Sequence, residues 1–254
     1  MAAGLRWVGY ATPAGGAPYV YVAQTDGGRI GLLWMDSSRL RFRYVPGYHV
    51  PETGPTMTAD TQPATWVPHM VAAFNGGFRL ADAVGGYFYA GRLVRSMMAG
   101  RAAFEISAGG RLEVGVWGQG LALTPGTVVI RQNLPPLVSG YRSQASPADS
   151  PDAWGRANGG LPHANRSALG QLADGALVFA YGSELSAVDM AAAMTAVNVR
   201  TAVMLDMNKS WPSAFVYRHV GGQIVGQRIL PSIWRDPTIY LHRFSKDFVV
   251  AMAP

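Results

Sequence analysis

The chain has 254 residues, 49% of them apolar, and a formal net charge of +6. This length and apolar content are sufficient for a large core, so we expect one compact domain over residues 1–254. The absence of cysteine excludes a disulfide framework, a thiol nucleophile and a thiolate metal site. Because no apolar stretch approaches about 18 residues and the N-terminus has no hydrophobic signal region, we expect neither a transmembrane segment nor a signal peptide.

The positive charge comes almost entirely from arginine, since the two lysines are Lys209 and Lys246. The basic residues are scattered along the chain. The one cluster, Arg39, Arg41 and Arg43, alternates with apolar residues, as on a half-exposed strand. We therefore expect no nucleic-acid partner. A basic surface instead favours an anionic substrate through long-range electrostatic steering.

Short β-branched and aromatic runs, separated by glycine-rich turns, predict many strands. In chain order we expect them at 7–10, 17–24, 29–34, 40–45, 71–74, 86–89, 102–107, 112–116, 128–131, 176–180, 201–205, 214–217 and 239–243. Ser186, with Asp189 three positions later, predicts the start of a helix that ends near Val197, with Asn198 as a left-handed terminator. The expected fold class is α+β, a single domain of many short strands in one or two mixed sheets with few helices.

Residues 139–162 differ from the rest of the chain. Gly, Ser, Pro and Asp dominate there, with Trp154 and Arg156 as isolated large side chains. This composition predicts a long loop or flap between two halves of the domain. Because a long loop in a compact enzyme often covers the active site, we expect this segment to act as a lid.

Three segments far apart in the sequence place polar groups where a buried strand should end or begin. The amide of Asn75 ends the run VAAF, the carboxylate of Asp206 ends TAVML, and the guanidinium of Arg166 opens RSALG. Each alone has an ordinary structural explanation, since Asn-Gly-Gly is a common tight turn, Asp after a strand is often a cap and Arg is often a surface charge. Taken together, they predict one cleft on which all three side chains converge.

The segments AAFNGGF, RSALG and MLDMN, in this order, resemble those of the phosphodiester glycosidases, particularly the bacterial branch. The stretches at 85–94 and 114–140 extend the resemblance over most of the chain. Members of the family commonly carry two glycines and then Ser or Thr after the aspartate, whereas Met207 and Asn208 follow Asp206 here. We expect this difference to affect substrate range more than fold, because larger residues forbid the close backbone approach that glycine permits.

The resemblance implies a hydrolase that cleaves the glycosidic bond of a sugar-1-phosphodiester and releases free sugar and a phosphomonoester. It implies a phosphorylated carbohydrate as partner, no cofactor, and a secreted or envelope-associated location in a bacterium, with any targeting segment absent from this chain. Two alternatives stay open. One is a non-catalytic binder of anionic glycans, and the other is a phosphodiesterase that cleaves the P–O bond.

A phosphate leaves more easily than an alkoxide, so fixed positive charge can replace the proton donor of ordinary glycosidases. No second catalytic carboxylate is recognisable beside Asp206. We therefore assign Arg166 as phosphate clamp and Asn75 as a group that holds sugar hydroxyls or phosphate oxygens. Asp206 is then the base or nucleophile, or it orients Arg166. The further substrate-binding candidates lie nearby in sequence: Gly76, Gly77, Arg79, His163, Asn208, Lys209 and Ser210.

Other polar and aromatic residues have two interpretations each. The histidines show no metal-ligand spacing, so we expect no metal site. One polar triplet either lines the cleft or satisfies backbone groups at a strand end: Arg131, Gln132 and Asn133. Four tryptophans are candidate sugar-stacking platforms, although core packing is favoured for each: Trp66, Trp117, Trp154 and Trp211.

Overall fold

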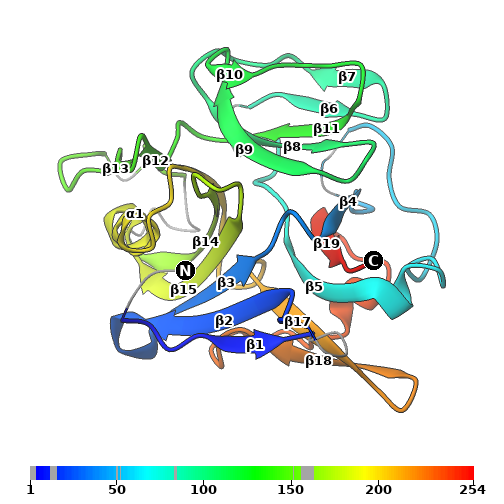
Figure 1. Cartoon of the computed structure of the whole chain (residues 1–254). Helices are drawn as coiled ribbons and strands as arrows, with labels where there is room; N and C mark the ends of the chain where they lie inside the picture. The colour runs from blue at the N-terminus through cyan, green and yellow to red at the C-terminus, as the bar shows by residue number, and fades with distance from the viewer. Residues whose placement is uncertain are drawn as a thin grey trace.

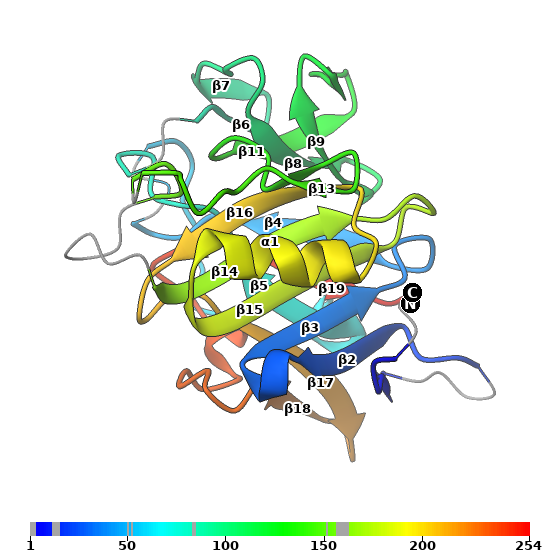
Figure 2. The same cartoon turned by 90° about the vertical axis from the view of Figure 1, so that its left-hand side faces the viewer.

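The computed structural model of the chain describes residues 4–11, 16–49, 51, 53–82, 85–150, 152–155 and 163–254. Within these residues it has three β-sheets and one α-helix (Figures 1 and 2). The fold is therefore largely β rather than a balanced α+β domain. The sequence analysis expected mixed sheets. In the described part of the chain, the short pairing of β10 with β9 is parallel and the other strand pairings are antiparallel, so the sheets are almost entirely antiparallel.

The largest sheet has eight strands in the order β1-β2-β3-β15-β14-β16-β12-β13. They are β1 (Val8–Tyr10), β2 (Val20–Thr25), β3 (Ile30–Met35), β12 (Val138–Ser139), β13 (Arg142–Ser143), β14 (Ala164–Gln171), β15 (Leu177–Leu185) and β16 (Thr201–Met207). The helix α1 (Ala187–Ala196) lies over the outer face of β14 and β15 (Figure 2). Its predicted start is confirmed, because Ser186 and Asp189 form a capping box, and Asn198 has the expected positive φ of 60°.

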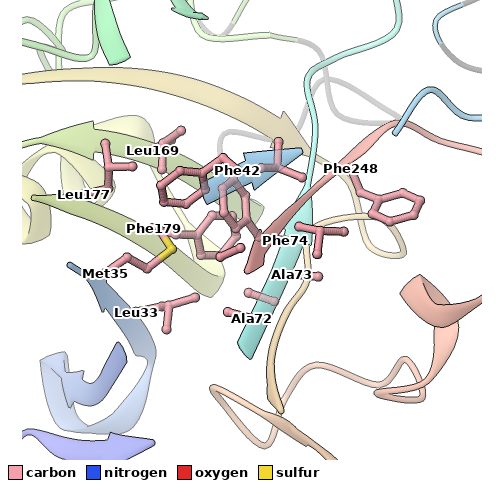
Figure 3. Close-up of a cluster of buried hydrophobic side chains, with 14 of the residues drawn as sticks. Leu33, Met35, Phe42, Ala72, Ala73, Phe74, Leu169, Leu177, Phe179 and Phe248 are labelled. Atoms are coloured by element: carbon pink, nitrogen blue, oxygen red, sulfur yellow. The ribbon is translucent and has the colours of Figure 1, made fainter. Parts of the chain in front are cut away.

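A five-stranded sheet packs on the opposite face, in the order β18-β17-β5-β19-β4. It comprises β4 (Arg41–Val45), β5 (Met70–Asn75), β17 (Ala214–Val220), β18 (Gln223–Arg228) and β19 (Phe248–Met252). Figure 3 shows the core between the two sheets, where Leu169 and Phe179 of the larger sheet meet Phe74 and Phe42 of the smaller one. The central β5 is buried along its whole length, which explains its uninterrupted apolar sequence up to Asn75.

A six-stranded sheet lies at one end of this sandwich, at the top of Figure 1, in the order β10-β9-β8-β11-β6-β7. It comprises β6 (Tyr87–Tyr89), β7 (Arg92–Arg95), β8 (Ala102–Ser107), β9 (Leu112–Trp117), β10 (Gly120–Leu121) and β11 (Thr127–Gln132). The end of β11 delivers Arg131 into the interior, so this third sheet contributes to the polar cluster described below.

Several predicted boundaries need correction. The strand expected at 239–243 is wrong, because the segment forms a 3-10 helix, η3 (Ile239–Leu241), that buries Tyr240. Two further 3-10 helices are η1 (Asp26–Gly28) and η2 (Val67–His69). The predicted strands omit seven strands of the structure: β7, β10, β12, β13, β14, β18 and β19. In the expected flap the described residues form the β12–β13 hairpin and turns up to Gly155, while residues 151 and 156–162 lie outside the described residues.

Within the described residues, no helix combines the length and apolar character that crossing a bilayer requires.

Candidate active site

The ends of β5 and β16 meet at the interface between the five-stranded and the eight-stranded sheets. Asn75 donates a hydrogen bond from Nδ2 to Ser167 Oγ at 2.9 Å. Ser167 in turn is the direct cross-strand partner of Asp206. The structure therefore brings two of the three predicted residues, Asn75 and Asp206, to one place, and Ser167, which the sequence analysis did not single out, connects them.

A β-bulge in β16 determines where Asp206 points. Ser167 pairs with Asp206 but the next residue, Ala168, pairs with Met204, so Leu205 is the extra residue on β16. Leu205 packs in the core between the sheets, and Asp206 faces the same side, where it contacts the residues that precede β19. Met204 and Met207 pack on the helix side. The bulge thus directs a charged side chain towards the five-stranded sheet.

Asp206 forms a buried ion pair with Lys246, and both side chains are 5% exposed. Its second oxygen, Oδ1, accepts the Met207 backbone N–H at 2.8 Å. Burial raises the pKa of Asp206 above its ordinary value, while the Lys246 ammonium and these hydrogen bonds act in the opposite direction. The expectation that Asp206 orients Arg166 is therefore wrong for this structure, because its charged partner is Lys246.

Asp247 is a second carboxylate in the cluster, which the sequence analysis missed. Its Oδ2 accepts hydrogen bonds from Arg131 Nε at 3.0 Å, from the Tyr44 hydroxyl at 3.0 Å and from the Gly77 amide at 3.4 Å. The Arg131–Asp247 ion pair is buried at 1% and 0% exposure. One oxygen of Asp247 therefore accepts hydrogen bonds from three donors. The negative charge of Asp247 also raises the pKa of the nearby Asp206 carboxyl.

Asn75 is fully engaged within the protein. Besides Ser167, its Nδ2 donates to the Gly76 carbonyl at 2.8 Å, and its Oδ1 accepts the Ser213 backbone N–H at 3.0 Å. The Ser213 hydroxyl is 2.8 Å from the Tyr240 hydroxyl. In this conformation the amide therefore links β5, β14 and the loop before β17, and contact with a substrate remains a prediction.

The two glycines after Asn75 are substrate-binding candidates, but their backbone amides are already bonded within the protein. The Gly76 N–H donates to the Asp247 carbonyl at 2.8 Å, and the Gly77 N–H points at the Asp247 carboxylate. A Cβ on Gly76 would lie 2.5 Å from Asp247 Cγ, and one on Gly77 would lie 2.6 Å from Asn133 Oδ1. These positions need glycine because neighbouring side chains approach the backbone closely.

Arg166 does not join this cluster, so the predicted convergence of all three residues is wrong. Its side chain extends from the opposite face of β14, where Nε donates to the Leu185 carbonyl at 2.8 Å and Nη1 to the Trp154 carbonyl at 3.2 Å. There it lines a cavity of about 290 Å³ beneath the residues of the predicted flap. Burial lowers the pKa of Arg166 to about 10, so the guanidinium stays charged at neutral pH.

Met207, which directly follows Asp206, lies beside this arginine. Its sulfur is 3.3 Å from Arg166 Nη1, and a Cβ on Gly155 would approach the same sulfur to 2.8 Å. The thioether thus fills the space between the start of β14 and the described end of the flap. A glycine at this position would leave that space open.

The other substrate-binding candidates are exposed or half-buried. Arg79 is exposed beside Asp82, at 3.6 Å, and His163 and Lys209 are also exposed. Asn208 and Ser210 are half-buried and bonded to each other, with the Ser210 N–H donating to Asn208 Oδ1 at 2.8 Å. Their contact with a substrate remains a prediction.

The polar triplet at the end of β11 is buried and serves mainly internal groups. Gln132 accepts from the Gly86 amide at 3.0 Å and the Met98 amide at 2.8 Å, and Asn133 donates to the Met204 carbonyl at 3.0 Å. The structure thus favours backbone satisfaction over cleft lining for these two. Among the candidate tryptophans Trp154 is buried, and the other three are half-buried: Trp66, Trp117 and Trp211.

Lys246 and Asp247 fit the pattern that identified Asn75 and Asp206, in which a polar residue adjoins one end of an apolar strand. Polar groups stand directly before the apolar run of β19, and the antiparallel pairing of Phe248 with Asn75 brings the start of β19 to the end of β5. Recognising FVVAM as a strand would have identified both residues. In the described part of the chain, no group of three His, Asp or Glu side chains is arranged to hold a metal ion.

A family model described as phosphodiester glycosidase matches residues 68–210. No curated protein sequence matches the chain. Among solved structures, the catalytic domain of zebrafish N-acetylglucosamine-1-phosphodiester alpha-N-acetylglucosaminidase, auto-inhibited by its pro-peptide, is similar in fold at 14% identity and a TM-score of 0.53, covering 98% of this chain and 88% of that one. A hypothetical protein from Synechocystis matches at 11% identity and a TM-score of 0.44, covering 98% and 61%.

Proposed function

Since the chain belongs to the phosphodiester glycosidase family and is an enzyme of that class, we propose that it hydrolyses the bond between a sugar anomeric carbon and a phosphodiester. The products are a free sugar and a phosphomonoester. The proposed substrates are glycans of a bacterial envelope or of the extracellular medium. The net charge of +6 supports an anionic substrate, because it attracts negatively charged molecules over long range.

The observation that carries the proposal is the meeting of Asn75, Ser167 and Asp206 in one polar cluster within the matched residues. We assign to Asp206 the role of base, which takes a proton from the water that attacks the anomeric carbon. The leaving phosphate needs no proton of its own at neutral pH, so one carboxylate suffices. Asp247, with Arg131, Tyr44 and Gly77 as donors to one oxygen, is less suited to act as an acid.

Two cationic side chains, Lys246 and Arg166, are candidates for contact with the departing phosphate, and they lie on different sides of β14. Lys246 contacts Asp206 directly, whereas Arg166 faces the cavity beneath Trp154 on the other side of β14. Arg166 stays the proposed phosphate clamp because its planar fork can bind two phosphate oxygens at once. Asp206 is 4% exposed, so this mechanism requires that substrate binding opens the strand ends between the two side chains.

Hydrolysis in ¹⁸O-labelled water tests the proposal. The wild-type protein is incubated with a panel of sugar-1-phosphodiesters, and both products are analysed by mass spectrometry. Label in the released sugar supports attack at carbon. Label in the phosphate would establish P–O cleavage instead, and an absence of hydrolysis across the panel would contradict the proposed substrate class.

A further inference from the structure

A cavity of about 430 Å³ lies at the start of β5, at the opposite end of this strand from Asn75. Its wall is formed by β1, the end of β17 and the residues of η2, and β1 lies beside β17 (Figure 1). Val71 in this wall is four positions from Asn75 along the strand, a separation of about 13 Å. The cavity is therefore distinct from the candidate active site.

The cavity wall carries positive charge. Arg218 contributes a guanidinium, and His69 and His219 contribute imidazoles, which are either neutral or positive. Among the described residues that line the cavity, none is Asp or Glu. Arg218 also forms no ion pair with a carboxylate in the described part of the chain. Its charge is therefore available to an anionic ligand.

An aromatic ring holds the Arg218 guanidinium in place. Its central carbon lies 4.6 Å from the ring centroid of Tyr10. The Tyr10 hydroxyl accepts a hydrogen bond from Gln227 Nε2 at 3.0 Å, which anchors the ring to β18. A guanidinium stacked on a ring keeps its N–H donors in its own plane, where they can bind two oxygens of one anion. Because the group is positioned before any ligand arrives, the entropy cost of binding is reduced.

The two histidines are anchored as well. His219 Nε2 lies 3.0 Å from the Met70 carbonyl oxygen. A carbonyl can only accept, so Nε2 carries the hydrogen, and Nδ1 is the nitrogen left for other contacts. The His69 carbonyl accepts the Ala253 N–H at 2.8 Å, which ties the end of η2 to the residues after β19.

The rest of the wall is apolar or aromatic. Val71 and Tyr217 belong to the buried core, and Pro68, Val220 and the half-buried Tyr19 also line the cavity. Apolar walls with a few polar groups that fix orientation, in a cavity of this volume, are typical of sites for small molecules. An inorganic anion would leave these apolar walls without a partner. The cavity therefore suits an anion that carries an apolar ring.

We propose that this cavity is a second binding site, for a small organic anion whose charged group binds Arg218 and whose apolar ring packs against Tyr19, Val71 and Val220. A carboxylate and a phosphate both present two oxygens to a guanidinium, so either head group fits. The proposal is independent of the proposed glycosidase activity, because the site uses no residue of the Asp206 cluster.

Calorimetric titration with three naphthalene ligands tests the site: 2-naphthoate, 2-naphthyl phosphate and the neutral 2-naphthylmethanol. At least one of the two anions should bind about tenfold more tightly than the alcohol, because only an anion gains charge-assisted hydrogen bonds. Binding of either anion in this way supports the site, and the tighter one identifies the head group. Equal affinity for the anions and the alcohol, or no binding of either anion, would overturn the site.

Arg218→Gln and the matched control Arg243→Gln locate the charge that the ligand uses. Both arginines are exposed and stack on a tyrosine, but Arg243 lies over Tyr48 at 4.7 Å and does not line the cavity. Arg218→Gln should weaken binding of the anion about tenfold and leave the alcohol unchanged, whereas Arg243→Gln should bind as wild type. Equal affinity of Arg218→Gln and wild type for the anion would overturn the site.

NMR of the histidine side chains locates the ligand in the wild-type protein, independently of any variant. Titration with the tighter anion should shift the imidazole resonances of His69 and His219. His49 is the control at the other end of β5, since its N–H donates to the Ser245 carbonyl at 3.0 Å, next to Lys246. Shifts at His49 without shifts at His69 or His219 would place the ligand near the candidate active site and overturn the proposal.

Discussion

Lys246 and Asp206 form a buried ion pair that joins the end of β16 in the eight-stranded sheet to the residue pair preceding β19 in the five-stranded sheet. Beside it, Asp247 pairs with Arg131 from the six-stranded sheet. All three sheets therefore meet at two buried ion pairs. Lys246 and Asp247, which are consecutive in the sequence, each contribute one partner to these pairs. Buried pairs of this kind are costly to break one partner at a time, because the remaining charge is left without compensation.

Asp206→Asn should lower both the turnover and the stability of the protein. The substitution preserves shape and removes the charge, so an enzyme that uses Asp206 as base should lose about 10² to 10⁴ in turnover with little change in substrate affinity. It also leaves Lys246 unpaired, which should lower the free energy of unfolding by about 3–5 kcal/mol. Steady-state kinetics and urea denaturation measure the two effects.

The double variant Asp206→Asn with Lys246→Met is the matched control. Removing both charges eliminates the unpaired ammonium, so much of the lost stability should return. Turnover should stay low if Asp206 acts chemically. Recovery of turnover together with stability would show that the single variant was inactive because it was poorly folded.

Lys246→Met should move the acidic limb of the pH–rate profile to higher pH. The ammonium lowers the pKa of Asp206, in opposition to burial, so its removal raises that pKa further. A base must be deprotonated to act, and kcat/KM should therefore fall at low pH and recover as pH rises above the new pKa. A purely structural Lys246 would instead lower Tm and leave the position of the limb unchanged.

The sequence predicted the elements with strong local patterns and missed those defined by pairing. The capping box of α1 and the apolar run of β5 are local signals, and both are confirmed. β14 reads ANRSALGQ, in which Arg166 and Ser167 are consecutive, so strand geometry itself sends their side chains to opposite faces. The bulge at Leu205 depends on the register between β14 and β16, which no pattern within either strand reveals.

Gly76→Ala and Gly77→Ala should each destabilise the protein, because the new Cβ would lie 2.5 Å from Asp247 Cγ or 2.6 Å from Asn133 Oδ1. Forcing these neighbours apart should cost about 1–3 kcal/mol in the free energy of unfolding. Gly126→Ala is the matched control, since a Cβ there meets no atom within 4 Å and its φ is not positive. Thermal denaturation of the three variants compares them, and equal Tm values would contradict the close packing around Gly76 and Gly77.

Arg166→Lys tests whether the guanidinium acts on the departing phosphate or only holds the fold together. Lysine retains the charge but loses the bidentate fork, so a clamp role predicts a transition-state penalty of about 2–4 kcal/mol on sugar-1-phosphodiesters. The penalty should shrink for an aryl glycoside, whose leaving group is stable without a clamp.

A structural role predicts a different result for the same variant. Arg166 donates to the carbonyls of Leu185 and Trp154, at the end of β15 and in the predicted flap. A lysine cannot reproduce both contacts with the same geometry, so Tm should fall whichever role is correct. The ratio of kcat/KM values for the two substrates is therefore the deciding measurement. If both substrates lose activity equally, Arg166 positions the flap and the start of β14, and the cation that stabilises the phosphate must be sought elsewhere, first at Lys246.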